Sequence, residues 1–170
     1  RHAVNVIEHP EGGLLVVGRE NLVRYTDDGA LDLSFGSGGM VDKSYHNFNR
    51  GSSVAITADG RIVVGSDQDN GWWRQTYYSL SGDFLSTSNI HQNEWGNPVQ
   101  SRGVYPLGDG TVVMVGSVDA RYFRSVQLDS NGNVIAQHYL PYDGVMSAEG
   151  SMRLPDGKIL VIGRDYGGSE

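Results

Sequence analysis

One short phrase occurs four times along this chain, and it constrains the fold more than any other feature. Each copy has a turn that contains glycine, then a run of apolar residues, then a second glycine. The copies are HPEGGLLVVG (9–18), TADGRIVVG (57–65), LGDGTVVMVG (107–116) and LPDGKILVIG (154–163). They close on glycines that are 47, 51 and 47 residues apart, namely Gly18, Gly65, Gly116 and Gly163. An internal period of this size indicates a repeat architecture.

A second turn follows the phrase in the first three copies. Its sequences are TDDGAL (26–31), LSGDFL (80–85) and DSNGNV (129–134). We therefore expect four short strands in each unit. In the first unit they are predicted at roughly Val4–Ile7, Leu14–Val17, Leu22–Tyr25 and Ala30–Phe35. The first turn of each unit is Asp-Gly or Glu-Gly, which signals a hairpin because glycine adopts positive φ without steric cost.

Four strands every 47–51 residues is the period of a β-propeller blade. The runs RIVVG, TVVMVG and KILVIG are nearly continuous in apolar character, which suits strands buried between stacked sheets. No segment carries helical periodicity. The sequence thus predicts an all-β, propeller-like array of four-stranded antiparallel blades with about 3.5 repeats. A β-sandwich or open meander is the competing fold, but sandwiches do not repeat one phrase four times.

The predicted blades cover residues 1–48, 49–98 and 99–146, and a half-blade covers 147–170. No second turn follows Gly163, so the last unit lacks its third and fourth strands. Propellers need about four to eight blades to close. We therefore expect an unpaired edge, and one of three arrangements: part of a larger propeller, a propeller completed by self-association or another chain, or a short open stack capped by its own loops.

The amino-acid composition argues against several classes of function. The 170 residues carry a formal net charge of −7, which argues against a generic binder of nucleic acid or anionic membranes. The chain has no cysteine, so disulfides, thiolate chemistry and cysteine-ligated metal sites are absent. No apolar run is long enough to span a membrane, so no membrane insertion is expected. The chain begins with Arg1 rather than Met, as expected of a mature or excised piece.

The stretch LVRYTDDGALDLSFGSGGMV (22–41) resembles the bacterial delta-sixty β-propeller repeat, a family first catalogued as a domain of unknown function. Its opening phrase is matched at 155–161 and at Gly163. Its later phrases are matched at Arg24, Tyr25, Asp28, Gly29, Leu31, Asp32, Ser34, Phe35, Gly36, Gly38 and Gly39. The second and third units match less well. The resemblance implies a propeller of large secreted or surface-attached bacterial proteins, with no established catalysis and no assigned site residues.

Aromatic residues in the loops between strands are the candidate ligand-binding residues. The second unit carries Trp72, Trp73 and Trp95, and the third carries Arg121 and Tyr122 at the equivalent hairpin. Such side chains stack on sugar faces or anchor protein partners. The alternative is that they fill the gap between successive sheets. Because adjacent strand residues face opposite ways, at least one of Trp72 and Trp73 is expected to be exposed.

Metal sites are weakly supported. Asp67 and Asp69 in SDQDNGWW (66–73) resemble a calcium loop, but the distant bidentate carboxylate is missing, and a polar hairpin is the favoured interpretation of the stretch. His46, His91 and His138 recur near the repeat period but at unequal distances from the second turn. Apart from calcium, no cofactor is expected.

The sequence leaves three functions open. The first is a non-catalytic binding or adhesion module of a bacterial secreted or cell-surface protein, with a protein or glycan as partner. The second is a structural spacer or assembly subunit. The third is a propeller-type hydrolase or lyase, which requires acidic residues from different blades to converge. No nucleophile elbow, phosphate loop or zinc-protease motif is present.

Overall fold

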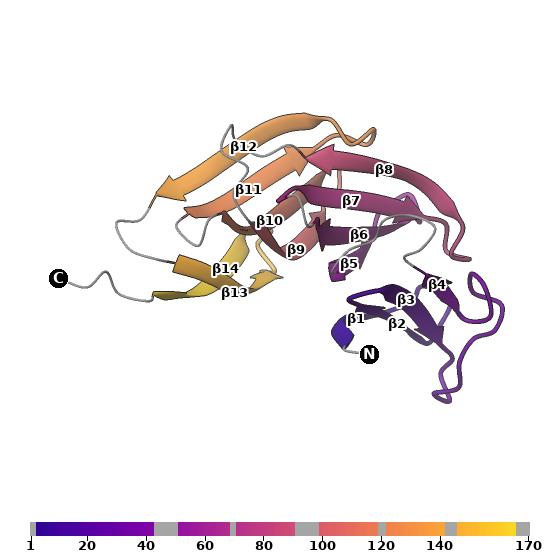
Figure 1. The fold of residues 1–170 in the computed structure, drawn as a ribbon. Coiled ribbons are helices and arrows are strands. Elements are labelled where there is room, and N and C mark those ends of the chain that lie inside the picture. The colour runs from indigo at the N-terminus through magenta and orange to yellow at the C-terminus, as the bar shows by residue number, and fades with distance from the viewer. Residues whose placement is uncertain are drawn as a thin grey trace.

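The computed structural model describes residues 3–42, 51–68, 71–90, 99–118, 122–141 and 146–165. These residues contain no helix, and they form the fourteen strands of Figure 1. The strands are β1 (Ala3–Glu8), β2 (Leu14–Gly18), β3 (Asn21–Tyr25), β4 (Met40–Asp42), β5 (Gly51–Ile56), β6 (Ile62–Asp67), β7 (Trp73–Tyr78), β8 (Phe84–Ile90), β9 (Val99–Pro106), β10 (Val112–Val118), β11 (Tyr122–Leu128), β12 (Val134–Pro141), β13 (Met146–Arg153) and β14 (Ile159–Asp165).

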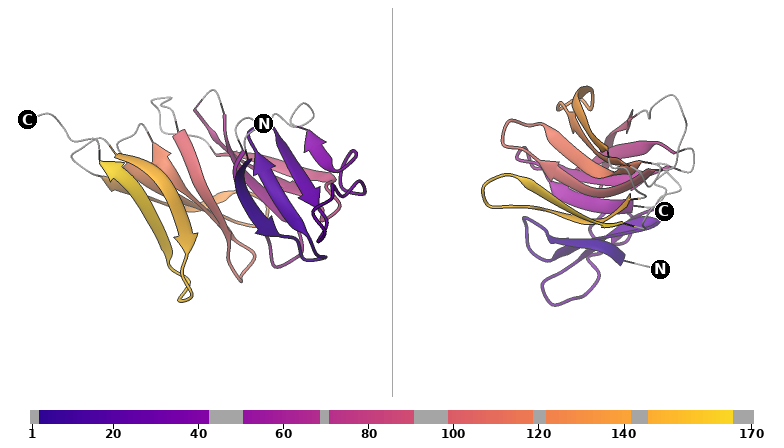
Figure 2. Two further views of the ribbon diagram at one scale, coloured as in Figure 1. Left: turned by 90° about the horizontal axis from the view of Figure 1, so that it is seen from below. Right: turned by 90° about the vertical axis from the view of Figure 1, so that its left-hand side faces the viewer.

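The strands form three four-stranded sheets and one hairpin. The sheets are β1-β2-β3-β4, β5-β6-β7-β8 and β9-β10-β11-β12, and among the described strands β13 pairs with β14 alone. Every pairing is antiparallel and joins strands that follow one another in the chain. Figure 2 shows the first sheet and the β13–β14 hairpin at the two ends of the array. The predicted all-β, propeller-like array of blades and a half-blade is confirmed. We refer to these units as blades 1 to 3 and the half-blade.

The fourth strand of blade 1 lies elsewhere than predicted. Ala30–Phe35 is not a strand, and β4 occupies Met40–Asp42 instead. The carboxylate of Asp32 accepts a hydrogen bond from the backbone N–H of Ser34 at 3.0 Å, which turns the chain. The Phe35 ring is then fully buried, and Gly36 N donates to Ser81 O of blade 2 at 2.8 Å. The segment is therefore a loop that fastens blade 1 to blade 2, and its shape depends on that neighbouring blade.

The core lies between successive sheets. One cluster joins blade 1 to blade 2, and its members are Leu15, Val17, Leu22, Phe35, Val54, Ile62, Val64 and Tyr78. A second joins blade 2 to blade 3, and its members are Val63, Trp73, Tyr77, Ile90, Val104, Val112, Met114, Val118, Val126 and Leu128. Neighbouring residues of β6 face opposite sheets, because Ile62 and Val64 belong to the first cluster and Val63 to the second. This double burial explains the continuous apolar runs in the sequence.

The glycine that closes each repeated phrase lies opposite the first strand of its unit. It pairs with a small residue of the first strand at or beside a β-bulge, the four partners being Ala3, Ser53, Ser101 and Ala148. A Cβ atom on Gly116 would lie 1.9 Å from Gln100 O and 2.9 Å from Cζ2 of Trp73 in blade 2. A Cβ on Gly163 would similarly lie 2.6 Å from Cζ of Phe123 in blade 3. Gly116 and Gly163 therefore each admit an aromatic ring from the preceding blade, whereas a Cβ on Gly65 would lie 3.1 Å from Cε of Met114 in blade 3.

Replacing Gly116 with alanine should destabilise the fold by about 1–3 kcal/mol or more, because the added methyl group meets backbone and a buried indole ring. Gly108→Ala is the matched control, since a Cβ there meets nothing within 4 Å. Urea unfolding followed by circular dichroism measures both. Equal midpoints for the two variants would contradict the packing described here.

A buried histidine also joins blade 1 to blade 2. His9 is only 4% exposed, and its Nδ1 accepts a hydrogen bond from Glu11 N at 3.2 Å. The ring proton therefore sits on Nε2, which donates to Leu80 O of blade 2 at 3.2 Å. Burial lowers the pKa of His9 below 6.5, and the nearby Arg24 guanidinium lowers it further, against smaller opposing effects from the Leu80 carbonyl, Glu11 and Asp32.

Because its folded-state pKa is depressed, His9 contributes stability that is present above about pH 6.5 and is lost as the pH falls through the folded pKa. The urea midpoint should therefore drop between about pH 7.5 and pH 5.5, and should drop less in His9→Gln. The other four histidines of the chain are the same in both proteins, so the difference between the two slopes reports on His9. The same slope in both proteins would remove His9 as the cause.

Candidate functional site

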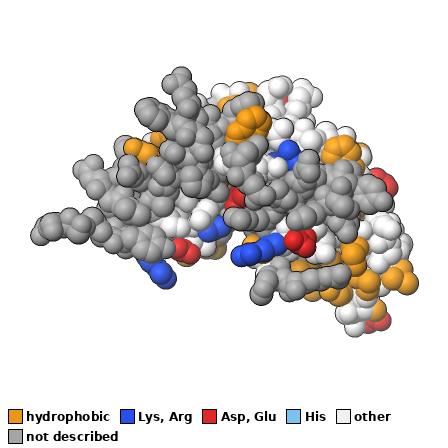
Figure 3. All heavy atoms as spheres, in the orientation of Figure 1, with side chains coloured by type: hydrophobic (Ala, Val, Ile, Leu, Met, Phe, Trp, Pro, Cys, Tyr) orange, Lys and Arg blue, Asp and Glu red, His pale blue; other side chains and the backbone are white. Residues whose placement is uncertain are grey.

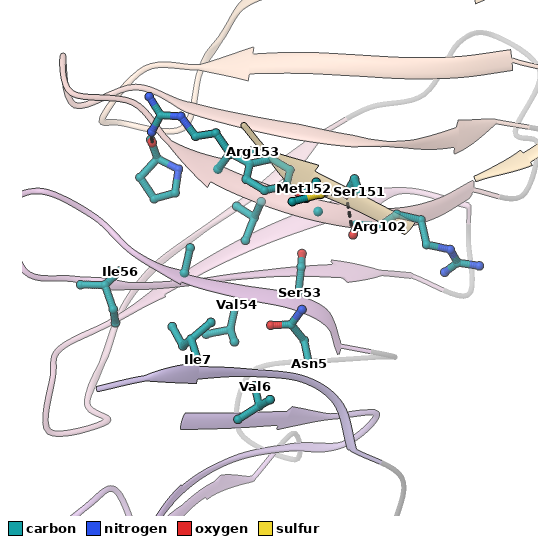
Figure 4. Close-up of a pocket in the computed structure, with 15 residues that line it drawn as sticks. Asn5, Val6, Ile7, Ser53, Val54, Ile56, Arg102, Ser151, Met152 and Arg153 are labelled. Carbon is teal, nitrogen blue, oxygen red and sulfur yellow. Dashed lines mark hydrogen bonds between the residues drawn. The ribbon is translucent and has the colours of Figure 1, made fainter. Parts of the chain in front are cut away.

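A groove runs along the first strands of all four units. It has a volume of about 470 Å³ and is drawn in Figure 4. Because β1, β5, β9 and β13 each contribute one wall, the groove follows the axis around which the blades are arranged. Its lining residues are Asn5, Val6, Ile7, Ser53, Val54, Ala55, Ile56, Arg102, Gly103, Val104, Tyr105, Pro106, Ser151, Met152 and Arg153.

Two guanidinium groups lie toward opposite ends of this groove (Figure 4). Arg102 donates from Nε to Ala148 O at 2.6 Å and from Nη2 to Gln100 Oε1 at 2.5 Å. Arg153 donates from Nη1 to Pro106 O at 2.9 Å. These acceptors are backbone carbonyls and a side-chain amide, which orient the guanidinium groups without neutralising them.

The charge of the groove differs in sign from that of the protein. Among the described residues that line it, two are arginines and none is Asp or Glu. The chain as a whole carries a net charge of −7. A cleft lined by one sign of charge attracts ligands of the opposite sign. The groove is therefore suited to an anion.

Neutral polar groups lie between the two arginines. Tyr105 OH donates to Ser151 Oγ at 2.7 Å, and Ser151 Oγ donates to Arg102 O at 3.0 Å. Burial raises the pKa of Tyr105, so the phenol keeps its proton at neutral pH. Asn5 and Ser53 lie next to each other on the opposite wall (Figure 4). The hydroxyl and amide groups that line the groove can exchange hydrogen bonds with a polar chain that lies along it.

Trp73 does not lie on a binding surface. Its side chain is fully buried between blades 2 and 3, and the Arg124 guanidinium carbon lies 5.3 Å from the centre of its ring. The prediction of Trp73 as a ligand-binding residue is therefore corrected. The ring fills the gap between sheets, because the glycine at position 116 leaves room for it.

Trp72 and Tyr122 occupy equivalent places in blades 2 and 3. Each directly precedes the aromatic residue that packs on a closing glycine, and each is half-buried. Both lie beside the hairpin that joins the second and third strands of their blade. Trp95 and Arg121, the other two predicted binding residues, lie outside the described residues.

The calcium candidate Asp67 has a structural partner. It is buried at the end of β6, and its Oδ1 accepts a hydrogen bond from Ser101 N of blade 3 at 2.6 Å. Asp69, His46 and His91 lie outside the described residues, whereas His138 is exposed on β12. Within the described ranges, no group of three or more His, Asp or Glu side chains could hold a metal ion. In the same residues, no helix is long and apolar enough to cross a membrane.

Sequence reasoning missed Arg102 and Arg153 as site residues. Both belong to first strands, and the repeat already located those strands. The repeat does not show that the first strands of all four units lie around one axis. That arrangement brings their side chains to one groove.

Trp72 and Trp73 differ in burial, so we expect replacement by alanine to lower the free energy of unfolding by different amounts. Trp73→Ala should destabilise the protein by about 3–5 kcal/mol, since it opens a cavity between two sheets. Trp72→Ala should cost less than half as much, because its ring is only half-buried. Guanidinium unfolding at neutral pH measures both values, and an equal loss would contradict the assignment.

Comparison with known proteins supports the fold. No protein-family model matches the chain, and no curated protein matches it. The structure is similar to that of a protein of unknown function from Bacteroides caccae, with a TM-score of 0.63 and 16% sequence identity. The alignment covers 94% of this chain and 52% of that one, so this chain spans about half of that protein's length. A likeness at this identity supports the propeller-like fold alone.

Proposed function

We propose that this protein is a non-catalytic binding module that holds an acidic glycan along its axial groove. The observation that carries the proposal is the pair of arginines, Arg102 and Arg153, in a groove whose described lining has no carboxylate. Guanidinium groups bind carboxylates through charge-assisted hydrogen bonds. The resemblance to the delta-sixty repeat favours a secreted or surface-attached bacterial setting.

A glycan suits the rest of the lining. The groups between the arginines are Asn5, Ser53, Tyr105 and Ser151, which donate and accept hydrogen bonds without charge. Sugar hydroxyls need such partners, whereas uronic acid carboxylates need the cations. The opposite placement of the arginines suits an extended chain rather than a single small anion (Figure 4).

Binding of a short oligogalacturonate tests this proposal, with a neutral oligosaccharide of the same length as comparison. Calorimetry should detect the acidic chain only, and the affinity should fall with added salt because screening weakens the attraction. Arg102→Gln and Arg153→Gln should each reduce the affinity about tenfold, which corresponds to the loss of about 1.4 kcal/mol.

Arg19→Gln is the matched control, because Arg19 is exposed and lies outside the groove. Its affinity should equal that of the wild-type protein. Equal binding of the neutral oligosaccharide, or the same loss with all three variants, would contradict the proposal. Preferential binding of polyglutamate would identify an acidic polypeptide as the ligand and overturn the assignment to a glycan.

A further inference from the structure

The array exposes an apolar sheet face at each end. The outward face of blade 1 carries Val4, Val6 and Leu14, and we call it the head face. The outward face of the half-blade carries Met152, Leu160 and Ile162, and we call it the tail face. All six side chains are between 43% and 58% exposed. Figure 3 shows hydrophobic atoms at the surface of blade 1, at lower right.

The strand register shows which internal residues correspond to the head face. Val6 pairs with Val16 as Val54 pairs with Val64, and Leu14 begins β2 as Ile62 begins β6. Val54, Ile62 and Val64 are the residues that blade 2 packs against blade 1. The head face therefore corresponds to the face of a blade that packs against the preceding blade.

The tail face corresponds to the other half of that contact. Met152 pairs with Leu160 in the half-blade as Ile7 pairs with Leu15 in blade 1, and Ile162 takes the place of Val17. In blade 1, Ile7, Leu15 and Val17 pack against blade 2. The tail face therefore corresponds to the face of a blade that packs against the following blade. Its residues are Met, Leu and Ile where blade 1 has Ile, Leu and Val.

The two faces are positioned to meet their counterparts on a second molecule. Blade 1 and the half-blade lie on the same lower side of the array (Figure 1), and β1 and β13 line one groove. A head-to-tail contact repeated twice closes a two-fold ring if the rotation between the molecules fits. Two copies supply eight blade positions, which is within the range in which propellers close.

We propose that two copies of this chain associate head to tail, so that the tail face of each packs on the head face of the other. The contact reproduces between molecules the packing that joins blade 1 to blade 2 within one molecule. The axial groove then becomes a channel lined by the first strands of both copies. The dimer does not depend on the proposed ligand.

Light scattering on a sizing column tests the dimer. The wild-type protein should show twice the chain mass of 18.5 kDa at micromolar concentration. Leu14→Asp on the head face and Ile162→Asp on the tail face should each give the single-chain mass, because either one alters both contacts of the ring. Ile135→Asp is the matched control, since Ile135 is 54% exposed on the outermost strand of blade 3 and belongs to neither face.

Mixing the two monomeric variants gives the sharpest result. A mixed dimer of L14D and I162D keeps one contact with both faces unaltered, so mixing should restore the doubled mass. If L14D is poorly folded by circular dichroism, Val4→Asp provides a second substitution on the head face.

Three results would overturn the proposal. A wild-type monomer at all concentrations means that the faces are covered by other means, such as further blades of a longer chain. Loss of the dimer with only one of the two variants indicates a symmetric contact through a single face. Open-ended growth of the wild-type mass indicates a filament instead of a ring.

Discussion

The close approach of successive sheets is the constraint on which the rest of the structure depends. Where an aromatic ring of one blade reaches the second strand of the next, no side chain fits, and the chain has glycine at positions 116 and 163. The same point carries a small residue and a bulge in the first strand. Sheet spacing, strand twist and burial of the aromatic ring are therefore set together. Hydrophobic contacts supply the attraction, but glycine sets the distance at which they operate.

Most of the fold could be predicted from the repeated phrase, since its turn and apolar run specify a hairpin with two buried faces. The exception is instructive. Ala30–Phe35 alternates like a strand, yet it folds as a loop, because burial of Phe35 and the bond from Gly36 to Ser81 come from blade 2. Local patterns describe a sheet well, but they do not describe a segment whose partner is another sheet.

The candidate site was less accessible to sequence reasoning for a geometric reason. Trp72 and Trp73 are adjacent and chemically alike, and their burial differs because neighbouring strand residues face opposite sides. Alternation predicts such a difference without saying which face meets the next blade. Arg102 and Arg153 are 51 positions apart in the chain and appear in no motif. Only the shared axis of the first strands brings them to one groove.

The aromatic contact on glycine has a consequence for how such a chain can be lengthened. Blades 2 and 3 carry Trp73 and Phe123, whereas the equivalent place in blade 1 is held by Glu20. Blade 1 fastens to its successor through the Phe35 loop and His9 instead. Blades 2 and 3 thus share one way of contacting the unit that follows them, whereas the contacts of blade 1 include hydrogen bonds to the backbone carbonyls of Leu80 and Ser81. A unit placed after blade 2 or blade 3 must therefore offer a glycine to the aromatic ring, whereas a unit placed after blade 1 need not.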